Sequence, residues 1–427
     1  MYNIQTMKIA IVPDNHLNKS TYNRIMDREF PNVPFRSADF MRSFEWSVDI
    51  SIRDLHPDLF IIPGDVYDNF DPSNEIRGFF SRQLNKLKEA QIQVVILIGN
   101  HDVCRKHHAL KDIQELDLKS VRIIEQPKIL LLKKFGLKLL MFPYSLDIEQ
   151  KKITLKESFN KFVEEVHEKD DGTPSLFFGH FGVKGGKINE YEEGDVLIET
   201  DTTTTPIRVK KAFVNQNPND IDLDDLDRIG SEYVFLGDYH RYQILPTKKC
   251  LAMYPGSMEK SDFSEVDQKK GFIIYDSEIE PSKNMGCCTF VEYPNCRPMK
   301  ELKGNFKQIK QQFSELDPSK YQEAIIKISF NGTSEELFAF SNGIESFKKE
   351  VRTALNPIHL YHVQSIEDDQ QQKEANRIEK EILEKGHMEA EDVIAVVKEI
   401  ITEQIEDDEE RLQTIDLAIE IFKETQE

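Results

Sequence analysis

Short apolar runs alternate with amphipathic stretches over roughly the first 275 residues. Such runs, bounded by polar residues, are typical of buried strands, and the amphipathic stretches between them are typical of helices. The runs predicted to be strands are Lys8–Val12, Leu59–Ile62, Val94–Ile98, Leu137–Phe142, Ser175–Phe178, Tyr233–Leu236 and Phe272–Tyr275. Strands that alternate with helices build layered domains, so the expected fold class is α/β.

Two helices are predicted among these strands. Helical spacing relates Phe40, Phe44, Trp46 or Ser47, and Ile50 to Ile52 before a break at His56-Pro57. A second helix is expected to begin at the cap Ser73 and to run to Ala90.

The pattern changes twice further along the chain. Residues 185–230 are polar and irregular, which predicts an inserted loop region. After Glu280, strand-like runs at Thr289–Val291 and Ala324–Phe330 and a helix near Glu335–Leu355 predict a smaller α+β unit. Beyond it, Gln, Glu and Lys with periodic Ile, Leu and Val predict helices. The expected parts are a main domain over 1–280, a small domain over 281–364 and a helical tail over 365–427.

Composition narrows the class of protein. No run approaches the roughly 18 apolar residues that cross a bilayer, and the start of the chain lacks the basic and apolar regions of a secretion signal. The five cysteines form no regular framework, and Cys287, Cys288 and Cys296 give only a weak zinc signal. We expect a cytoplasmic, nucleoid-associated protein, or one of the host cytoplasm if the chain is viral.

Charge is concentrated in the tail. The formal net charge is −21, and Ser365–Glu427 holds 21 Asp or Glu against 7 Lys or Arg, a net of −14. Residues 1–364 carry the remaining −7, a moderate excess of negative charge. A moderately acidic region of this kind can act on nucleic acid if metal ions or a partner protein supply the positive charge that phosphates need.

Five short segments place metal-ligand residues directly after predicted strands. A histidine beside one strand is usually structural, but five such segments in order are hard to attribute to chance. The segments are Asp14-Asn15-His16, Gly64-Asp65-Val66-Tyr67-Asp68, Gly99-Asn100-His101-Asp102, Gly179-His180 and Gly237-Asp238-Tyr239-His240. Open α/β sheets place their sites at this end of the strands, so the segments are expected to converge.

Carboxylates and imidazoles in this number favour two divalent cations. A pair about 3.5–4 Å apart activates water and shields phosphoryl oxygens in phosphoester hydrolysis, and one carboxylate must bridge the pair. Asp65 is the best candidate, because Gly64 lets the backbone turn sharply before it. Mixed oxygen and nitrogen ligands suit Mn²⁺, with Mg²⁺, Fe²⁺ or Zn²⁺ as alternatives.

The segments resemble the calcineurin-like metallophosphoesterases, whose pattern is DxH, GDxxD, GNHD, GH and GHxH. A further stretch, Tyr254-Pro-Gly-Ser-Met-Glu-Lys-Ser-Asp-Phe-Ser-Glu265 followed by Lys270-Gly-Phe272, resembles SbcD-type double-strand-break repair nucleases. The resemblance implies a layered sandwich of two sheets flanked by helices, with a DNA-capping-like domain after it. It also implies a Mn²⁺-dependent nuclease that acts on DNA and binds an SMC-like ATPase through its C-terminal helices. The resemblance further implies a homodimer formed through helices of the main domain, with the Ser73–Ala90 helix as a candidate surface.

The resemblance also assigns roles to residues. One cation would be held by Asp14, His16, Asp65 and His240, and the other by Asp65, Asn100, His180 and Asp238. His101 would act on the leaving oxygen, with Asp102 orienting its ring. Asp68 would support the site or serve as a turn residue, and Arg105, Lys106, Lys184 and Lys187 are candidates for contacts with DNA phosphates.

Asp238 departs from the pattern, since the family usually has histidine at this position. An added carboxylate would tighten binding of a hard cation and lower its Lewis acidity. Two other readings remain open: a general metallophosphatase or phosphodiesterase, and a non-catalytic DNA-end-binding scaffold. The extra segment and domains favour the nuclease over the first, and the nearly complete ligand set favours it over the second.

Overall fold

The structure is a computed structural model that describes residues 6–19, 21, 25–104, 106–115, 119–200, 203–214, 220–282 and 284–366. Arg105 and the expected tail helices of residues 367–427 lie outside these ranges. In the described part, no helix is both long and apolar enough to traverse a bilayer.

The first sheet has six strands in an order set by crossovers. Strands β1 to β4 run parallel to one another, whereas β13 is antiparallel to β1 and β14 is antiparallel to β13. The order is β14 (Cys288–Glu292), β13 (Gly271–Asp276), β1 (Lys8–Ile11), β2 (Leu59–Pro63), β3 (Gln93–Leu97) and β4 (Val121–Ile124).

The second sheet also has six strands. Its four inner strands are parallel, and the two edge strands β11 and β5 are antiparallel to their neighbours. The order is β11 (Gln243–Ile244), β12 (Leu251–Tyr254), β10 (Tyr233–Gly237), β7 (Ser175–His180), β6 (Leu137–Phe142) and β5 (Lys128–Leu132).

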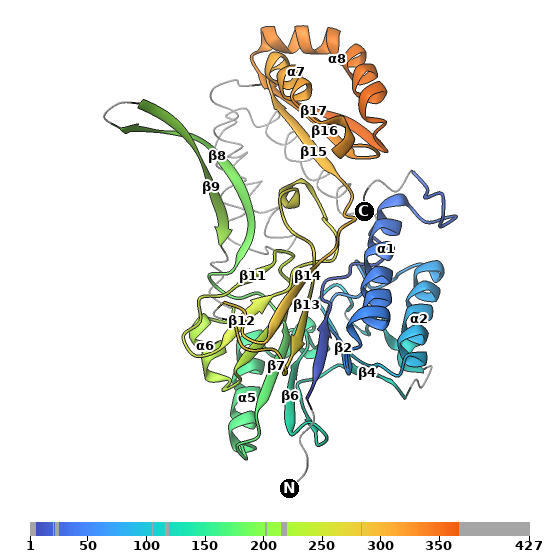
Figure 1. Ribbon diagram of the computed structural model, residues 1–427, viewed down its shortest axis with the longest axis vertical. Helices are drawn as coiled ribbons and strands as arrows, with labels where there is room; N and C mark the ends of the chain where they lie inside the picture. Colours follow the sequence, from blue (N-terminus) through green and yellow to red (C-terminus); the bar gives the residue numbers. More distant parts are fainter. Residues whose placement is uncertain are drawn as a thin grey trace, which may run out of the picture. The chain divides into compact units, whose positions relative to one another are not determined.

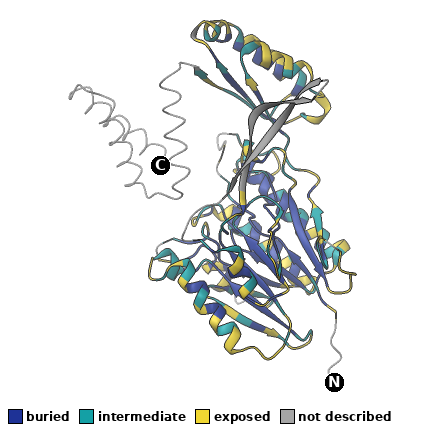
Figure 2. Cartoon of the chain, turned by 90° about the vertical axis from the view of Figure 1, so that its left-hand side faces the viewer, coloured by how far each residue is buried: buried dark blue, intermediate teal, exposed yellow. Residues whose placement is uncertain are grey.

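Apolar side chains from the two sheets share one core. Ile9 and Ile61 of the first sheet lie in the same buried cluster as Leu139, Phe178 and Phe235 of the second. Figure 2 shows how burial concentrates in these sheets. The expected α/β sandwich of two sheets is therefore confirmed.

Helices cover the outer faces of the sheets (Figure 1). The first sheet carries α1 (Phe35–Ile50), which continues as a π-helix (Ser51–Leu55) and ends at His56, and α2 (Asn74–Glu89), capped by Ser73. Residues of α5 (Leu155–Glu168) and α6 (Leu223–Arg228) join the outer cluster of the second sheet. The short helices are α3 (Lys111–Glu115) and α4 (Leu146–Glu149).

A three-stranded sheet follows, in the order β15 (Met299–Gly304), β16 (Ile325–Gly332) and β17 (His359–Ile366). Its helices are α7 (Phe306–Ser314), a 3₁₀ turn (Pro318–Lys320) and α8 (Ser334–Leu355). The run Thr289–Val291, which we expected in this smaller unit, lies instead in β14, because that strand pairs with β13.

The polar region 185–230 is not a loop throughout. It forms a two-stranded antiparallel ribbon of β8 (Lys187–Thr200) and β9 (Thr203–Val214), visible as the long green hairpin in Figure 1. Polar residues make up most of β8 and half of β9, so both strands lack the longer apolar runs that identified the strands of the sandwich.

Candidate metal centre

The five metal-ligand segments lie at the carboxyl ends of parallel strands in the two sheets, either just after a strand or, for Gly179-His180, as the last two residues of β7. Four of the expected ligands have positive φ: +50° at Asp14, +40° at His16, +50° at Asp65 and +105° at Asp238. Residues with a Cβ rarely adopt positive φ, and such strain clusters where the surrounding structure fixes a functional side chain. The backbone N–H of His16 donates to the carbonyl oxygen of Asp65 at 3.1 Å, which joins two of these loops.

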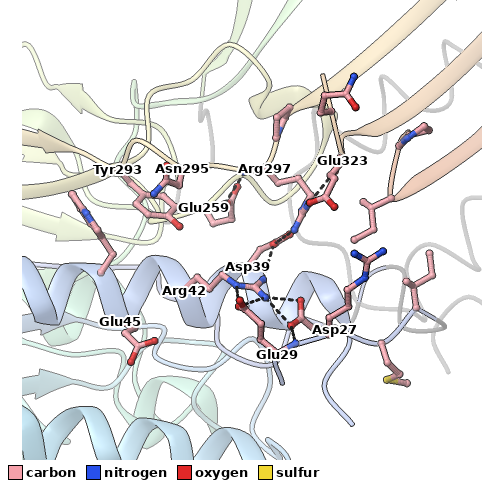
Figure 3. Close-up of a pocket in the computed structure, with 18 of the residues that line it drawn as sticks. Asp27, Glu29, Asp39, Arg42, Glu45, Glu259, Tyr293, Asn295, Arg297 and Glu323 are labelled. Carbon is pink, nitrogen blue, oxygen red and sulfur yellow. Dashed lines mark hydrogen bonds and ion pairs between the residues drawn. The ribbon is translucent and has the colours of Figure 1, made fainter. Parts of the chain in front are cut away.

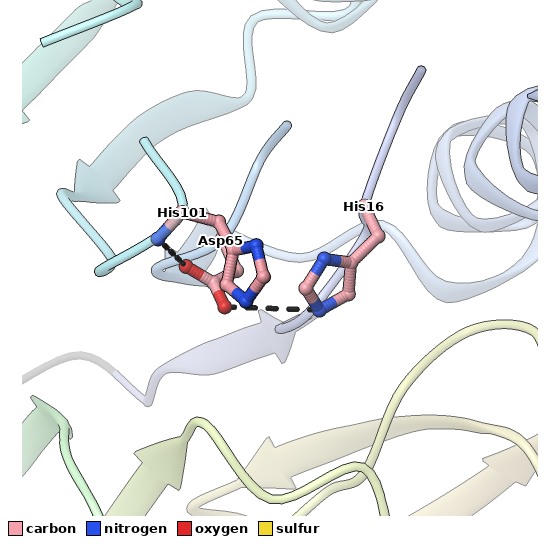
Figure 4. A group of neighbouring side chains, drawn as sticks. All are labelled: His16, Asp65 and His101. Carbon is pink, nitrogen blue, oxygen red and sulfur yellow. Dashed lines mark hydrogen bonds and ion pairs between the residues drawn. The ribbon is translucent and has the colours of Figure 1, made fainter. Parts of the chain in front are cut away.

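Asp65 lies at the centre of the cluster (Figure 4). Its Oδ1 accepts a hydrogen bond from the backbone of His101 at 3.0 Å and lies 3.3 Å from His180 Nε2, while Oδ2 lies 3.7 Å from His16 Nε2. Two groups of potential ligand atoms, each within 4.8 Å, share this residue: His16, Asp65 and His101, and Asp14, Asp65 and His180. Asp65 therefore occupies the place that a bridging carboxylate requires.

Glycines make this close approach feasible. A Cβ on Gly64, whose φ is +99°, would lie 2.1 Å from Nδ1 of His180. A Cβ on Gly99 would lie 2.1 Å from Oδ1 of Asp65. The glycines before Asp65 and Asn100 thus leave the space that the ligands occupy.

Contacts at both ring nitrogens hold His180 in place. Its Nδ1 donates to the carbonyl oxygen of Pro63 at 2.7 Å, and its Nε2 lies 2.8 Å from Asn100 Oδ1. Burial disfavours a charged ring, but the carboxylates of Asp65, Asp14 and Asp238 outweigh burial and raise the pKa of His180 to about 10. A cation bound at Nε2 of His180 would displace the proton from this nitrogen.

His16 and His240 approach each other through Nε2 atoms 2.8 Å apart. Burial lowers the pKa of His16 to about 4, so this ring is neutral near pH 7. The Nδ1 of His240 lies 2.9 Å from Oε1 of Glu265. Glu265 was not among our predicted site residues, although it lies within the stretch that resembles the repair nucleases.

Asp14 provides a direct test of whether a cation fits. The residue is fully buried, and its Oδ1 accepts a hydrogen bond from the backbone of Asp238 at 3.0 Å. Within the described part of the chain, Oδ2 has no hydrogen-bond partner, and burial raises the pKa of Asp14 to about 7. An orphaned carboxylate oxygen beside imidazole nitrogens is the donor set that a divalent cation would satisfy.

Asp238 contacts the cluster of candidate ligands through its backbone. Its backbone fixes Asp14, but its carboxylate belongs to neither group of converging ligand atoms among the described residues. The side chain is half-buried.

Asp102 does not orient His101, contrary to expectation. Its buried carboxylate accepts hydrogen bonds from the backbone of Val66 at 3.3 Å, Tyr67 at 3.0 Å and Gly99 at 3.0 Å. It therefore ties together the loops after β2 and β3. The exposed ring of His101 instead has its Nδ1 2.9 Å from the carbonyl oxygen of Asp68.

The remaining described candidates are Asp68, Lys184 and Lys106. The carboxylate of Asp68 lies 2.9 Å from Lys19 Nζ and 3.3 Å from His16 Nδ1, so it supports a candidate ligand. Lys184 forms an ion pair with Asp222 at 3.1 Å, and Lys106 is exposed.

A cavity of about 940 Å³ lies elsewhere, and no candidate metal ligand lines it. Its wall contains a two-pronged ion pair (Figure 3): Arg297 Nε lies 2.6 Å from Asp39 Oδ2, and Nη2 lies 2.5 Å from Oδ1. Asp39 belongs to α1, and Arg297 precedes β15, so this pair connects the main domain to the small sheet.

Comparisons with known proteins agree with the geometry. The family profile described as "Calcineurin-like phosphoesterase" matches residues 7–242. The SbcD component of the nuclease SbcCD of Staphylococcus epidermidis is 24% identical over 269 residues, which cover 60% of this chain and 64% of that protein. "DNA double-strand break repair protein Mre11" of Sulfurisphaera tokodaii is 32% identical over 123 residues, covering 28% and 29%.

A further relative, "Uncharacterized metallophosphoesterase YhaO" of Bacillus subtilis, is 19% identical over 85% of this chain and 79% of its own length. The chain thus spans less than two thirds of the first two relatives. The family profile, however, covers more than half of the chain and every metal-ligand segment. This chain belongs to the calcineurin-like phosphoesterase family.

Proposed function

We propose that this chain is a Mn²⁺-dependent DNA nuclease, the catalytic component of an SbcCD-like repair or recombination complex. The observation that carries the proposal is the position of Asp65, which is shared between two groups of converging ligand atoms. Hydrolysis of a phosphodiester by paired cations requires such a shared carboxylate.

In this proposal, Asp14, His16, Asp65 and His240 hold one cation, and Asp65, Asn100, His180 and Asp238 hold the other. When bound, the cations would lower the pKa of a water molecule and neutralise charge on the phosphate. Nitrogen and oxygen ligands together favour Mn²⁺, with Mg²⁺ as the alternative.

His101 serves in this proposal as the catalytic acid. It is exposed, whereas Asp14, His16 and Asp65 beside it are buried, so it lies on the side that a substrate can reach. Its backbone is anchored to Asp65, and its Nδ1 is engaged by the carbonyl oxygen of Asp68. Because Nδ1 already donates to that carbonyl oxygen, the acid role requires a second proton on Nε2, which the ring gives to the leaving oxygen.

DNA is the substrate that the relatives favour. The names of two of them specify a nuclease and a DNA double-strand break repair protein. Arg105, Lys106 and Lys184 are proposed to contact phosphates, although Lys184 must exchange its ion pair with Asp222 to do so. A general phosphodiesterase remains the second reading, since the same metal chemistry serves both.

The proposed partners are a second copy of the chain and an SMC-like ATPase. The expected dimer helix, α2, directs Ile76, Phe79, Phe80, Leu84 and Leu87 into the core of its own protomer. A dimer through α2 would therefore rest on its polar face. Light scattering at micromolar protein concentration should give the mass of a dimer. The mass of a monomer would contradict the proposed homodimer.

The decisive assay incubates the protein with end-labelled duplex and single-stranded DNA in Mn²⁺, Mg²⁺ or EDTA. A nucleoside phosphodiester is the control substrate. We expect DNA cleavage in Mn²⁺ and none in EDTA. Turnover of the small phosphodiester with intact DNA would favour the general phosphodiesterase, and DNA binding without any cleavage would favour the scaffold.

A further inference from the structure

The ring of His240 is held from behind by a buried carboxylate. Its Nδ1 lies 2.9 Å from Glu265 Oε1 and 3.3 Å from the hydroxyl oxygen of Ser261, while its Nε2 points toward His16. An ionised carboxylate can accept hydrogen bonds but cannot donate them. The Nδ1 atom of His240 therefore carries the proton, and Nε2 keeps its lone pair. Glu265 thus selects the tautomer that can bind a cation.

Glu265 is itself fixed by a buried cation. Only 3% of Glu265 and 1% of Lys270 are exposed, and Lys270 Nζ lies 2.7 Å from Glu265 Oε2. The same oxygen accepts a hydrogen bond from the backbone of Ser261 at 2.8 Å. Burial disfavours the charged carboxylate, but Lys270 and His240 outweigh burial and hold the pKa of Glu265 well below its usual range.

Lys270 holds His240 at a second point as well. Its Nζ donates to the backbone carbonyl oxygen of His240 at 2.9 Å and to the hydroxyl of Ser257 at 2.9 Å. One ammonium group therefore fixes the main chain of His240 and the carboxylate behind its ring. Both Glu265 and Lys270 come from the Tyr254–Phe272 stretch, which follows the last ligand segment in the chain.

The two halves of the site are supported differently. The ring of His180 is held by a neutral carbonyl group, that of Pro63, whereas the ring of His240 is held by a full negative charge. A carboxylate behind a ligating imidazole increases its basicity more than a carbonyl group does, and loss of such a partner typically costs about 10–100-fold in metal affinity.

We infer that Glu265 and Lys270 are positioning residues that set the affinity of one half of the metal site, the half that contains His240. This inference rests on the proposed two-cation function. It assigns a role to the stretch that resembles the repair nucleases: the stretch supplies a charged support for one ligand.

The test is calorimetric titration of the metal-free full-length protein with Mn²⁺, without DNA. The Glu265→Gln variant keeps the shape of the side chain and removes its charge. We expect one of two binding events to weaken about 10–100-fold and the other to keep its affinity. Cleavage by this variant should recover as the Mn²⁺ concentration is raised.

Glu259→Gln is the matched control. Glu259 is 1% exposed and lies in the same stretch, but it accepts hydrogen bonds from the backbone of Lys260 and Arg297. This variant should bind both cations as the unmodified protein does. Equal affinities in the Glu265→Gln variant, or an equal loss in the Glu259→Gln variant, would overturn the inference.

A double variant guards against misfolding. Glu265→Gln combined with Lys270→Gln removes both members of the ion pair and leaves no uncompensated buried charge. It should fold and show the same selective loss of one binding event, and retention of both events at full affinity would overturn the inference. Because the titration needs no substrate, failure of the unmodified protein to cleave DNA would contradict the nuclease assignment without deciding this one.

Discussion

His16 and His240 come from opposite sheets of the sandwich, yet their Nε2 atoms lie 2.8 Å apart. Two ring nitrogens approach this closely only when a proton or a cation lies between them, because their lone pairs otherwise repel. The backs of both rings face carboxylates, Asp68 behind His16 and Glu265 behind His240. The fold thus aims two imidazoles at one point and supports each with a negative charge.

Replacement of His101 by alanine should separate chemistry from binding. The ring is proposed to protonate the leaving oxygen, a contribution worth about 10²–10⁴-fold in rate. We expect turnover to fall by that factor while affinities for Mn²⁺ and DNA stay within about twofold, since the proposed role belongs to the transition state. Single-turnover cleavage and titration measure the two quantities. His107→Ala is the control, and comparable losses in both variants would count against the assignment.

Asp238 is the position where the chain departs from its family. If its carboxylate binds a cation, Asp238→Ala should weaken one Mn²⁺ binding event about tenfold or more, and Asp238→His should retain activity with altered metal preference. Asp238→Asn is the comparator for backbone effects, because asparagine tolerates the positive φ of this residue better than alanine does. Identical Mn²⁺ stoichiometry and affinity in the alanine variant would remove Asp238 from the ligand set.

The Asp39–Arg297 pair should contribute strongly to stability. Asp39 is 5% exposed, receives two hydrogen bonds from Arg297 and also pairs with the fully buried Arg36, so its removal leaves a buried positive charge without its carboxylate. We expect Asp39→Ala to lower the free energy of unfolding by about 3–5 kcal/mol, measured by urea denaturation. The exposed Asp49, in the same helix and paired with Lys86, is the control. An equal effect at both positions would contradict this account of the junction.

Sequence predicted correctly those strands whose own residues form a long apolar run. All seven predicted strands form, because each is an apolar run that the sandwich buries on both faces or nearly so. Besides the β8–β9 ribbon, the strands β4, β5, β11, β12, β15 and β17 were not predicted. In the edge strand β4, for example, only Ile124 of the four residues is buried, so its apolar signal is weak. Convergence of Asp14, Asp65 and His180 was also predictable, because parallel strands bring their carboxyl ends to one edge.

Tertiary partners could not be predicted in the same way. The partners of Asp102 are backbone amides, two of them in another loop, and no sequence spacing reveals such contacts. Glu265 reaches His240 across 25 positions, inside a stretch whose family resemblance gave no hint of what its carboxylate touches. Long-range hydrogen bonds of this kind become visible only in three dimensions.

Truncation after Gln364 should separate nuclease activity from partner binding. The removed segment carries a net charge of −14 and periodic apolar residues, which suit it to a basic surface of an SMC-like ATPase. We expect Mn²⁺-dependent cleavage by the truncated chain alone to persist, while affinity for the ATPase and ATP-stimulated cleavage are lost. Pull-down and cleavage assays measure both. Full affinity in the truncated chain would show that docking occurs elsewhere.

The most direct test of the account is the cleavage of end-labelled duplex DNA by the unmodified protein and its Asp65→Asn variant across a Mn²⁺ titration. Asparagine keeps the shape and tolerates the φ of +50°, so the change removes little besides the charge that both cations share. Asp147→Asn, whose side chain is 45% exposed, is the control. The account predicts cleavage by the unmodified protein and the control, and none by the Asp65→Asn variant at any Mn²⁺ concentration. Normal cleavage by that variant would contradict it.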